Sequence, residues 1–288
     1  MKKVLVSGST GFVGDYVVKE LLKRGHEIVA TSAHLNNAIQ KGWYPYVTYI
    51  PFNFAQYDEN IDYFSLFGNP DILIHLAWEG LPNYKDQFHV EVNFPRHLAF
   101  LTNLIRNGLK DLTVSGTCLE YGKQEGCLIE ELPSRPETSY AVSKNLLRLA
   151  LEQLQPQFPF NFKWIRLFYM YGKGQNPNSL FSQLENAIKN GSTAFNMSGG
   201  EQKRDYLKVE EVAENITSIA LQTKIKGIIN CCSGIPITIK ELVSQFIEEK
   251  HSSIKLNFGY NPYTDYEPMS FWGDKTKLNS IISSINSL

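Results

Sequence analysis

The sequence opens with Met1-Lys-Lys-Val-Leu-Val-Ser-Gly-Ser-Thr-Gly-Phe-Val-Gly14, and this stretch decides the fold. Val4-Leu5-Val6 is a short apolar run, mainly of β-branched residues, which is typical of a strand buried on both faces. After the glycines that follow it, apolar residues recur at helical spacing until Gly25. The stretch therefore predicts a strand, a glycine-rich turn and a helix over residues 12–23.

The glycines of this turn are spaced three residues apart, unlike the Gly-x-Gly-x-x-Gly of long-chain dehydrogenases. In such a unit one glycine permits the tight turn, one lets the backbone approach a pyrophosphate, and one lets the helix pack on the strand. The phosphates then meet unpaired N–H groups and the positive end of the helix dipole. An ordinary glycine turn is the alternative, but the strand and helix on either side favour a nucleotide site. Its residues would be Gly8, Thr10, Gly11, Phe12, Val13 and Gly14.

The composition describes an ordinary globular chain of 288 residues, 43% of them hydrophobic, with a net charge of −1. This length fits one large α/β domain or two coupled lobes. The basic residues are dispersed, which argues against a nucleic-acid or membrane partner. No apolar run approaches the roughly 18 residues of a membrane span, and a strand follows the first lysines, so we expect a cytoplasmic protein. The four cysteines and six histidines show no ligand spacing, so no metal is expected, and His75 is expected in the core.

Further strand-like runs alternate with helical patterns along the chain. Strands are predicted over residues 26–32, 47–52, 70–75 and 112–115, and helices over 87–107 and 139–155. This alternation predicts an α/β fold with a Rossmann-type doubly wound parallel sheet. Beyond about residue 172 the pattern weakens, which indicates a smaller, less regular C-terminal lobe for the substrate. The predicted dinucleotide-binding domain covers residues 1–171, with returning segments near 205–234. The predicted substrate-binding lobe covers residues 172–204 and 235–288.

Ligands of doubly wound sheets bind beyond the carboxyl ends of the strands, where Gly8, Ala77 and Ser115 would lie. An acidic residue after the second strand would hold the ribose 2′-hydroxyl of NAD, but residues 31–36 contain none. The absence of that carboxylate removes repulsion against a 2′-phosphate, and Ser32 and His34 can donate to one. NADP is therefore the favoured cofactor and NAD the alternative.

Tyr140 and Lys144 lie near the start of the last of these helices, with Thr138 or Ser139 as its cap. Residues four apart share a helix face, so both side chains can point into one site. A neighbouring ammonium favours the phenolate, which would turn this tyrosine into a general acid or base near neutral pH. A surface tyrosine on an amphipathic helix is the alternative.

A second Tyr-x-x-x-Lys match, at Tyr169 and Lys173, contains Gly172 and follows a strand-like run. Its two side chains therefore need not share a face. The order of features along the chain favours the first match: a glycine turn, a Leu-Ala-Trp strand end, a Ser/Thr strand end, and then Tyr140 with Lys144.

This order resembles the extended short-chain dehydrogenase/reductase family, of the NAD-dependent epimerase/dehydratase type, over essentially the whole chain. The glycine spacing, His75-Leu-Ala77, Thr117-Cys-Leu-Glu-Tyr-Gly122 and Arg204-Asp-Tyr-Leu-Lys-Val-Glu-Glu-Val212 carry the resemblance, together with the Tyr140 and Lys144 pair. The resemblance implies catalysis by Thr117, Tyr140 and Lys144. It implies cofactor contacts also from Ser32, Asn53, Phe54, Leu76, Ala77, Trp78, Asn93, Ser115, Leu167 and Phe168. It implies substrate contacts from Thr117, Tyr140, Tyr169, Asn178 and Arg204, with Arg204 on the pyrophosphate.

Departures from the family pattern narrow the implied activity. The 4,6-dehydratases carry Asp-Glu after the catalytic threonine, whereas this chain has Cys118 and Leu119, which argues against dehydration. Tyr169 stands where many epimerases have asparagine. Residues 261–278 are similar to the tail of reductases that act on CDP- or dTDP-linked 4-keto-6-deoxyhexoses, although an aromatic packing segment is the alternative.

The sequence therefore predicts an NAD(P)H-dependent reductase of a CDP- or dTDP-linked 4-keto-6-deoxyhexose, with Tyr140 as general acid, in deoxysugar biosynthesis. A nucleotide-sugar 4-epimerase that recycles NAD is the second hypothesis. A non-catalytic nucleotide-binding protein of the same fold is the third. Family members often pair through the two helices at 87–107 and 139–155, so the resemblance also implies a homodimer.

Overall fold

The computed structural model of the protein defines the backbone over residues 1–286 and the side chains over residues 1–284. Its centre is a seven-stranded sheet in the order β12-β7-β5-β4-β1-β2-β3, and every pairing in it is parallel. The strands are β1 (Lys3–Ser7), β2 (Glu27–Thr31), β3 (Thr48–Tyr49), β4 (Ile72–His75), β5 (Asp111–Thr117), β7 (Asn161–Leu167) and β12 (Gly227–Cys231). The predicted Rossmann-type doubly wound sheet is confirmed, and its strand order reverses between β1 and β4.

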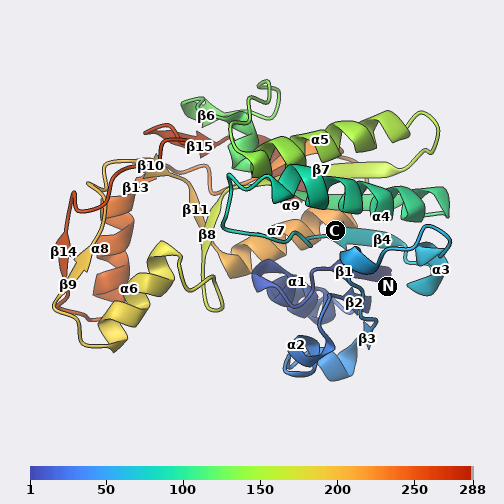
Figure 1. Ribbon diagram of the computed structural model, residues 1–288, viewed down its shortest axis with the longest axis horizontal. Coiled ribbons are helices and arrows are strands. Elements are labelled where there is room, and N and C mark those ends of the chain that lie inside the picture. Colours follow the sequence, from blue (N-terminus) through green and yellow to red (C-terminus); the bar gives the residue numbers. More distant parts are fainter. Residues whose placement is uncertain (287–288) are drawn as a thin grey trace.

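Helices cover both faces of this sheet (Figure 1). The helices that pack on it are α1 (Phe12–Lys23), α4 (Phe94–Arg106), α5 (Ser139–Leu154), α7 (Val209–Leu221) and α9 (Thr276–Asn286). One apolar cluster joins Val17 of α1, Ile216 of α7 and Leu278 of α9 to the sheet. The other joins Phe100 of α4 and Leu147 of α5 to the opposite face.

Two predicted elements differ from their expected lengths. The third strand covers only Thr48–Tyr49 rather than residues 47–52, although the N–H groups of Ile50 and Phe52 still donate to carbonyls at the end of β2 at 3.1 Å. The helix expected over residues 87–107 starts as a π-helical turn, His89–Asn93, and continues as α4. Pro95 fits the first turn of α4, where a missing N–H leaves no hydrogen bond unmade.

A smaller lobe lies to one side of the sheet, on the left of Figure 1. It contains α6 (Leu180–Lys189), α8 (Ile239–Glu249), β9 (Ala194–Asn196), β10 (Lys203–Arg204), β13 (Ile237–Thr238) and β14 (Lys255–Asn257). Its own apolar core includes Leu184, Phe195 and Val243. The lobe is less regular than the main sheet, as expected, while the residue boundaries drawn from the sequence stay a prediction.

Short pairs of strands connect the lobe to the sheet: β8 (Tyr169–Tyr171) with β11 (Tyr206–Lys208), and β6 (Gly126–Leu128) with β15 (Phe271–Gly273). The remaining helices are α2 (Leu35–Ile39) and α3 (Tyr63–Leu66). Across residues 1–286, every helix is too short or too polar to cross a lipid bilayer.

Candidate functional site

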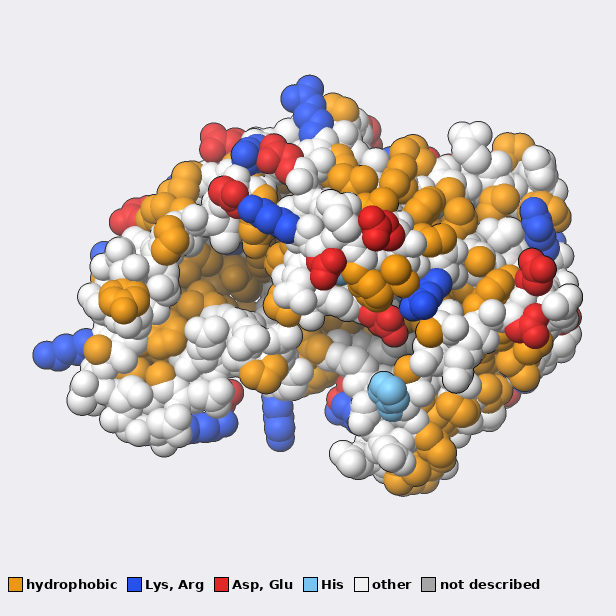
Figure 2. Space-filling view, viewed as in Figure 1, with side chains coloured by type: hydrophobic (Ala, Val, Ile, Leu, Met, Phe, Trp, Pro, Cys, Tyr) orange, Lys and Arg blue, Asp and Glu red, His pale blue; other side chains and the backbone are white. Residues whose placement is uncertain are grey.

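A cavity of about 560 Å³ lies at the carboxyl ends of the central strands. Figure 2 shows the surface hollowed between the smaller lobe and the main sheet. Most of the site residues predicted from the sequence line this cavity: Gly8, Gly11, Phe12, Val13, Gly14, Leu76, Trp78, Ser115, Thr117, Tyr140, Lys144, Leu167, Phe168, Tyr169 and Asn178. Residues that are far apart in the sequence therefore meet at one edge of the sheet.

The glycine turn at one end of the cavity has the geometry of a phosphate cradle. Gly8 has a φ of +74°, and a Cβ there would lie 2.7 Å from the Ala77 nitrogen. A Cβ on Gly14 would collide with the carbonyl of Gly8. Among the described residues, no side chain caps the start of α1, so its first N–H groups face the cavity unpaired. This turn fits the pyrophosphate of a dinucleotide.

Several residues predicted to contact the cofactor do not line the cavity. Thr10 donates its hydroxyl to Ser32 at 3.0 Å, so the two side chains hold the turn to the end of β2. Asn53 accepts a hydrogen bond from the Ala55 N–H, which caps a short turn. Phe54 is buried in the core, with its ring centroid 4.3 Å from that of His97.

Ala77 and Asn93 also lie outside the lining. Ala77 packs its backbone against Gly8, which brings β4 close to the glycine turn. Asn93 is only 1% exposed and donates its amide to the Glu79 carbonyl at 2.9 Å. A buried side chain that holds a loop cannot be distinguished by sequence from one that contacts a ligand.

Tyr140 and Lys144 lie on the first turns of α5, whose cap is Thr138, accepting from the Ala141 N–H at 3.2 Å. Lys144 donates its ammonium to the Ser115 carbonyl at 2.8 Å. Burial lowers the pKa of Lys144 to about 7, and the charge of Glu120 opposes that shift.

The pKa of Tyr140 moves in the direction opposite to the one predicted from the sequence. Burial raises it, the nearby Tyr84 adds to that shift, and a hydrogen bond with Thr117 opposes it. The Lys144 ammonium lies 6.0 Å from the centroid of the Tyr140 ring and is bonded to a carbonyl instead. The expected lowering by Lys144 is therefore wrong for this structure, and Tyr140 holds its proton at neutral pH.

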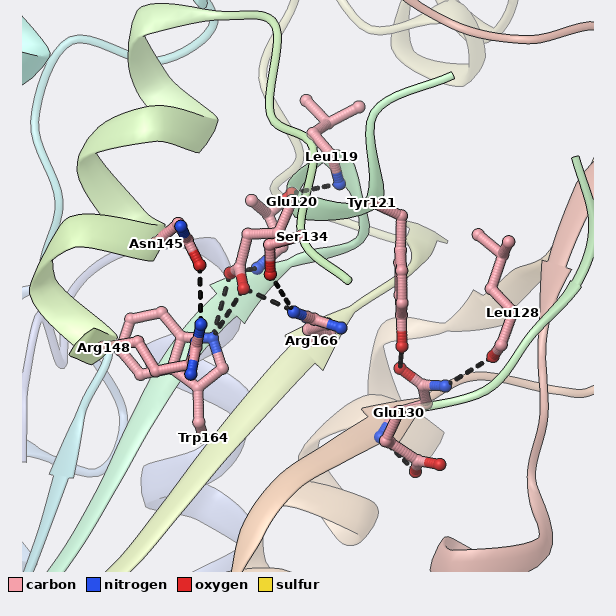
Figure 3. A network of polar contacts seen from close by, with 12 residues as sticks. Leu119, Glu120, Tyr121, Leu128, Glu130, Ser134, Asn145, Arg148, Trp164 and Arg166 are labelled. Carbon is pink, nitrogen blue, oxygen red and sulfur yellow. Dashed lines mark hydrogen bonds and ion pairs between the residues drawn. The ribbon is translucent and has the colours of Figure 1, made fainter. Parts of the chain in front are cut away.

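Thr117 ends β5 and is fixed by a buried carboxylate. The Glu120 side chain accepts from the Thr117 N–H at 2.9 Å, from Trp164 Nε1 at 2.9 Å and from Arg166 Nε at 3.0 Å. Figure 3 shows Glu120 between the tryptophan and the arginine, both from β7. The side chains of Glu120 and Arg166 are fully buried, so this ion pair is part of the frame that positions Thr117.

Arg204 lines a second cavity, of about 230 Å³, on the side of the smaller lobe. It donates to the Glu267 carboxylate at 3.0 Å, and its guanidinium lies 4.6 Å from the centroid of the Phe271 ring. Tyr169 donates its hydroxyl to the same carboxylate. Tyr169 and Glu267 line both cavities, so the predicted pyrophosphate arginine lies next to the cavity of Tyr140 rather than within it.

The sequence predicted that His75 lies in the core, and the structure confirms this position. It is fully buried, with Nδ1 2.7 Å from the Ser7 hydroxyl and Nε2 2.8 Å from His97 Nδ1. Within the described residues, no group of three metal-ligating side chains comes together. Tyr169 of the second Tyr-x-x-x-Lys match lies on β8 rather than on a helix.

The sequence prediction missed residues that the fold brings into the cavity, mainly Tyr84, Cys118 and Glu267. Tyr84 accepts the Tyr140 N–H with its carbonyl at 2.9 Å, and no local pattern marks this loop residue. Cys118 directly follows Thr117. Glu267 lies in the aromatic-rich tail, and its spacing from Asp265 and Tyr266 gives no signal that it faces inward.

The chain is similar to known nucleotide-sugar enzymes over most of its length. Residues 4–232 match the family model described as the NAD dependent epimerase/dehydratase family. The chain is 31% identical to the dTDP-6-deoxy-L-talose 4-dehydrogenase (NAD(+)) of Aggregatibacter actinomycetemcomitans, over 94% of this chain and 99% of the relative. It is 24% identical to the dTDP-4-dehydro-6-deoxyglucose reductase of Escherichia coli, over 83% of this chain and 79% of that one.

Among solved structures, UDP-glucuronic acid 4-epimerase from Bacillus cereus, in complex with UDP-glucuronic acid and NAD, aligns with a TM-score of 0.84. The alignment covers 98% of this chain and 93% of that chain, at 21% identity. This likeness supports the fold alone.

Proposed function

The chain belongs to the NAD-dependent epimerase/dehydratase family of nucleotide-sugar enzymes, and we propose that it reduces the C4 ketone of a nucleotide-linked 4-keto-6-deoxyhexose. The observation that carries the proposal is the arrangement of Thr117, Tyr140 and Lys144 around the cavity that also contains the glycine turn.

The glycine turn and the start of α1 would hold the pyrophosphate of a nicotinamide dinucleotide, which when bound supplies the hydride. Tyr140 would donate the proton to the ketone oxygen as a general acid, and because burial raises its pKa it carries that proton at neutral pH. The Thr117 hydroxyl would donate to the same oxygen as negative charge develops there. The Lys144 ammonium would lie beside Tyr140 and bind hydroxyl groups of the cofactor.

The second cavity would take the nucleotide part of the substrate. Arg204 is suited to a diphosphate because a guanidinium binds two oxygens in one plane. Glu267 now holds this guanidinium, so a diphosphate would compete with a carboxylate for it. Tyr169 and Asn178, which line the larger cavity, would contact the sugar.

The names of two relatives, both given for dTDP sugars, support a dTDP-linked sugar, and the resemblance of residues 261–278 keeps a CDP-linked sugar as the alternative. For the cofactor we propose NADPH first and NADH second. No acidic residue follows β2, and Ser32 stands there with its hydroxyl bonded to Thr10 and Tyr49. The 31% identical relative is named for NAD(+), which keeps NADH as the second donor.

The test is NADPH oxidation with dTDP- and CDP-4-keto-6-deoxyglucose, with NADH run in parallel. Stoichiometric consumption of one donor, with formation of a 6-deoxyhexose reduced at C4, would support the reductase. If neither donor is consumed with either sugar, the reductase is wrong.

A 4-epimerase is the second candidate, favoured by the name of the matching family. It would interconvert UDP-hexoses without added cofactor, on a dinucleotide that remains bound through purification. A non-catalytic nucleotide-binding protein remains the third, and loss of turnover in active-site variants would exclude it.

We also propose a homodimer through α4 and α5, as the family resemblance implies. Leu146 and Leu149 of α5 are 37% and 42% exposed and lie three residues apart on one helix face, which a partner's helix would cover. Light scattering should give twice the chain mass of 32.8 kDa, and Leu146→Glu combined with Leu149→Glu should give the monomer mass.

A further inference from the structure

The Lys144 ammonium is held by a carbonyl and by an aromatic face. Its Nζ donates to the Ser115 carbonyl at 2.8 Å and lies 4.0 Å from the centroid of the Trp78 ring. The Lys144 side chain is 1% exposed, and among the described residues no carboxylate forms an ion pair with it. A desolvated cation at this distance from an indole is attracted by the negative face of the ring.

The Trp78 ring is itself fixed from two sides. Its Nε1 donates to His89 Nδ1 at 3.1 Å, and His89 Nε2 lies 3.1 Å from the Asn83 carbonyl. Since a carbonyl only accepts, Nε2 of His89 carries the proton and Nδ1 is free to accept from the indole. The ring also stacks on His97, with centroids 4.7 Å apart and planes 19° apart.

We propose that Trp78 is a positioning residue whose indole face holds the Lys144 side chain in the cavity and stabilises its charged form. The inference rests on the proposed function in one respect, that Lys144 acts with Tyr140 in catalysis. The sequence predicted Trp78 as a cofactor contact, and this role is different because Trp78 acts through Lys144.

An aromatic ring suits this place better than a carboxylate. A carboxylate would take one or two of the three N–H donors of Lys144 and would neutralise it, whereas the ring takes none. With one donor on the Ser115 carbonyl, two remain for a ligand in the cavity. The nearest acid, Glu120, cannot compete, because Arg166, Trp164 and the Thr117 N–H occupy it.

The other ionisable groups around Lys144 leave its titration distinct. They come from every packed element: Glu120 from the turn after β5, His75 from β4, His89 from the π-helical turn, His97 from α4 and Tyr140 from α5. Burial lowers the pKa of all three histidines, that of His75 to about 3, and raises the pKa of Tyr140. The test therefore follows the signal of Lys144 itself rather than the total proton release of the site.

The test is an NMR titration of the protein labelled with ¹³C and ¹⁵N in its lysines, with the Lys144 signal assigned by its loss in Lys144→Met. Because the indole favours the charged form, its removal should lower the pH at which Lys144 titrates. We expect Trp78→Leu to move the midpoint down by about 1.5 pH units, the size of a desolvated cation–π interaction. Trp78→Phe keeps a weaker aromatic face and should give a midpoint between the two.

Trp272→Leu is the matched control, because Trp272 lies on β15 away from the cavity. In this variant Lys144 should titrate with the same midpoint as in the wild type. The same midpoint in wild type, Trp78→Phe and Trp78→Leu would overturn the inference. If Trp78→Leu does not fold, Trp78→Phe alone decides by the same criterion. The titration needs no substrate, so it stands or falls separately from the proposed reductase.

Discussion

The pKa values of Tyr140 and Lys144 are both shifted in the direction that favours the neutral side chain. Burial raises the pKa of the phenol and lowers the pKa of the ammonium to about 7, because a low-dielectric site disfavours either charge. At neutral pH the phenol is protonated and the amine is partly charged. Tyr140 therefore carries the proton that the proposed reduction would deliver to the ketone.

Replacement of Tyr140 by phenylalanine should abolish ketone reduction. The ring, 8% exposed, keeps its packing, while the proton donor is lost, so we expect kcat to fall by roughly 10²–10⁴-fold. Cofactor binding, measured by quenching of intrinsic fluorescence, should be retained within about threefold. Substantial turnover in this variant would contradict the assignment of the general acid.

The pH dependence of reduction should follow Lys144. Its ammonium is present below a pKa of about 7 and is lost as the pH rises, so kcat/KM should decline above that pH. The measurement is the pH profile between about 6 and 9. In Lys144→Met the remaining activity should show no such decline, and a flat profile in the wild type would show that the charge of Lys144 is not needed.

At the scale of elements, the close approach of β1, the glycine turn and α1 leaves no room for a side chain at Gly14. Its replacement by alanine would drive a methyl group into the Gly8 carbonyl. We expect the free energy of unfolding to fall by about 1–3 kcal/mol and dinucleotide binding to be lost.

Gly42→Ala is the control for this change, because Gly42 has open space around it and no left-handed φ. It should unfold in urea as the wild type does and bind the dinucleotide normally. Equal binding by Gly14→Ala and Gly42→Ala would contradict the role assigned to the turn.

The sequence predicted the main elements well because their signals are local. Alternating apolar runs and a cap at Thr138 suffice to locate β1, α1 and α5. The start and length of α5 could be read from the sequence. The place of Tyr84 could not, because its contact with α5 depends on how a loop after β4 folds over the cavity.

The site was predictable where residues belong to strand ends or helix starts. Arg204 and Glu267, by contrast, meet only because the tail returns to the lobe, and Asn93 faces a loop rather than the cavity. Such orientations depend on the packing of the whole chain. The roles of all these residues in binding and catalysis stay predictions.

At the scale of the whole molecule, the pair His75 and His97 connects stability to pH. Burial lowers the pKa of both, so the unfolded chain binds protons that the folded chain excludes. Stability should therefore be full above the ordinary pKa of about 6.5 and fall as the pH decreases below it. Two such groups imply a loss of about 2.5 kcal/mol between pH 7 and 5.5, measured by urea unfolding.

Histidine variants separate this effect from general acid sensitivity. His97→Gln should reduce the slope of stability against pH by about half, since one of the two groups is removed. His34→Gln, at an exposed position, should leave the slope unchanged. An unchanged slope in His97→Gln would show that the buried histidine pair is not the origin of the pH dependence.

The apolar cluster that joins α1, α7 and α9 has a consequence for synthesis on the ribosome. Val4 and Val6 of the first strand and Leu278 and Ile281 of α9 belong to the same cluster. All seven strands of the main sheet have been made once residue 231 has emerged. At that point the cluster still lacks α9, which is synthesised last. A nascent chain thus exposes apolar surface of its earliest segment until α9 leaves the exit tunnel, and in that interval it is a substrate for chaperones that recognise such surface.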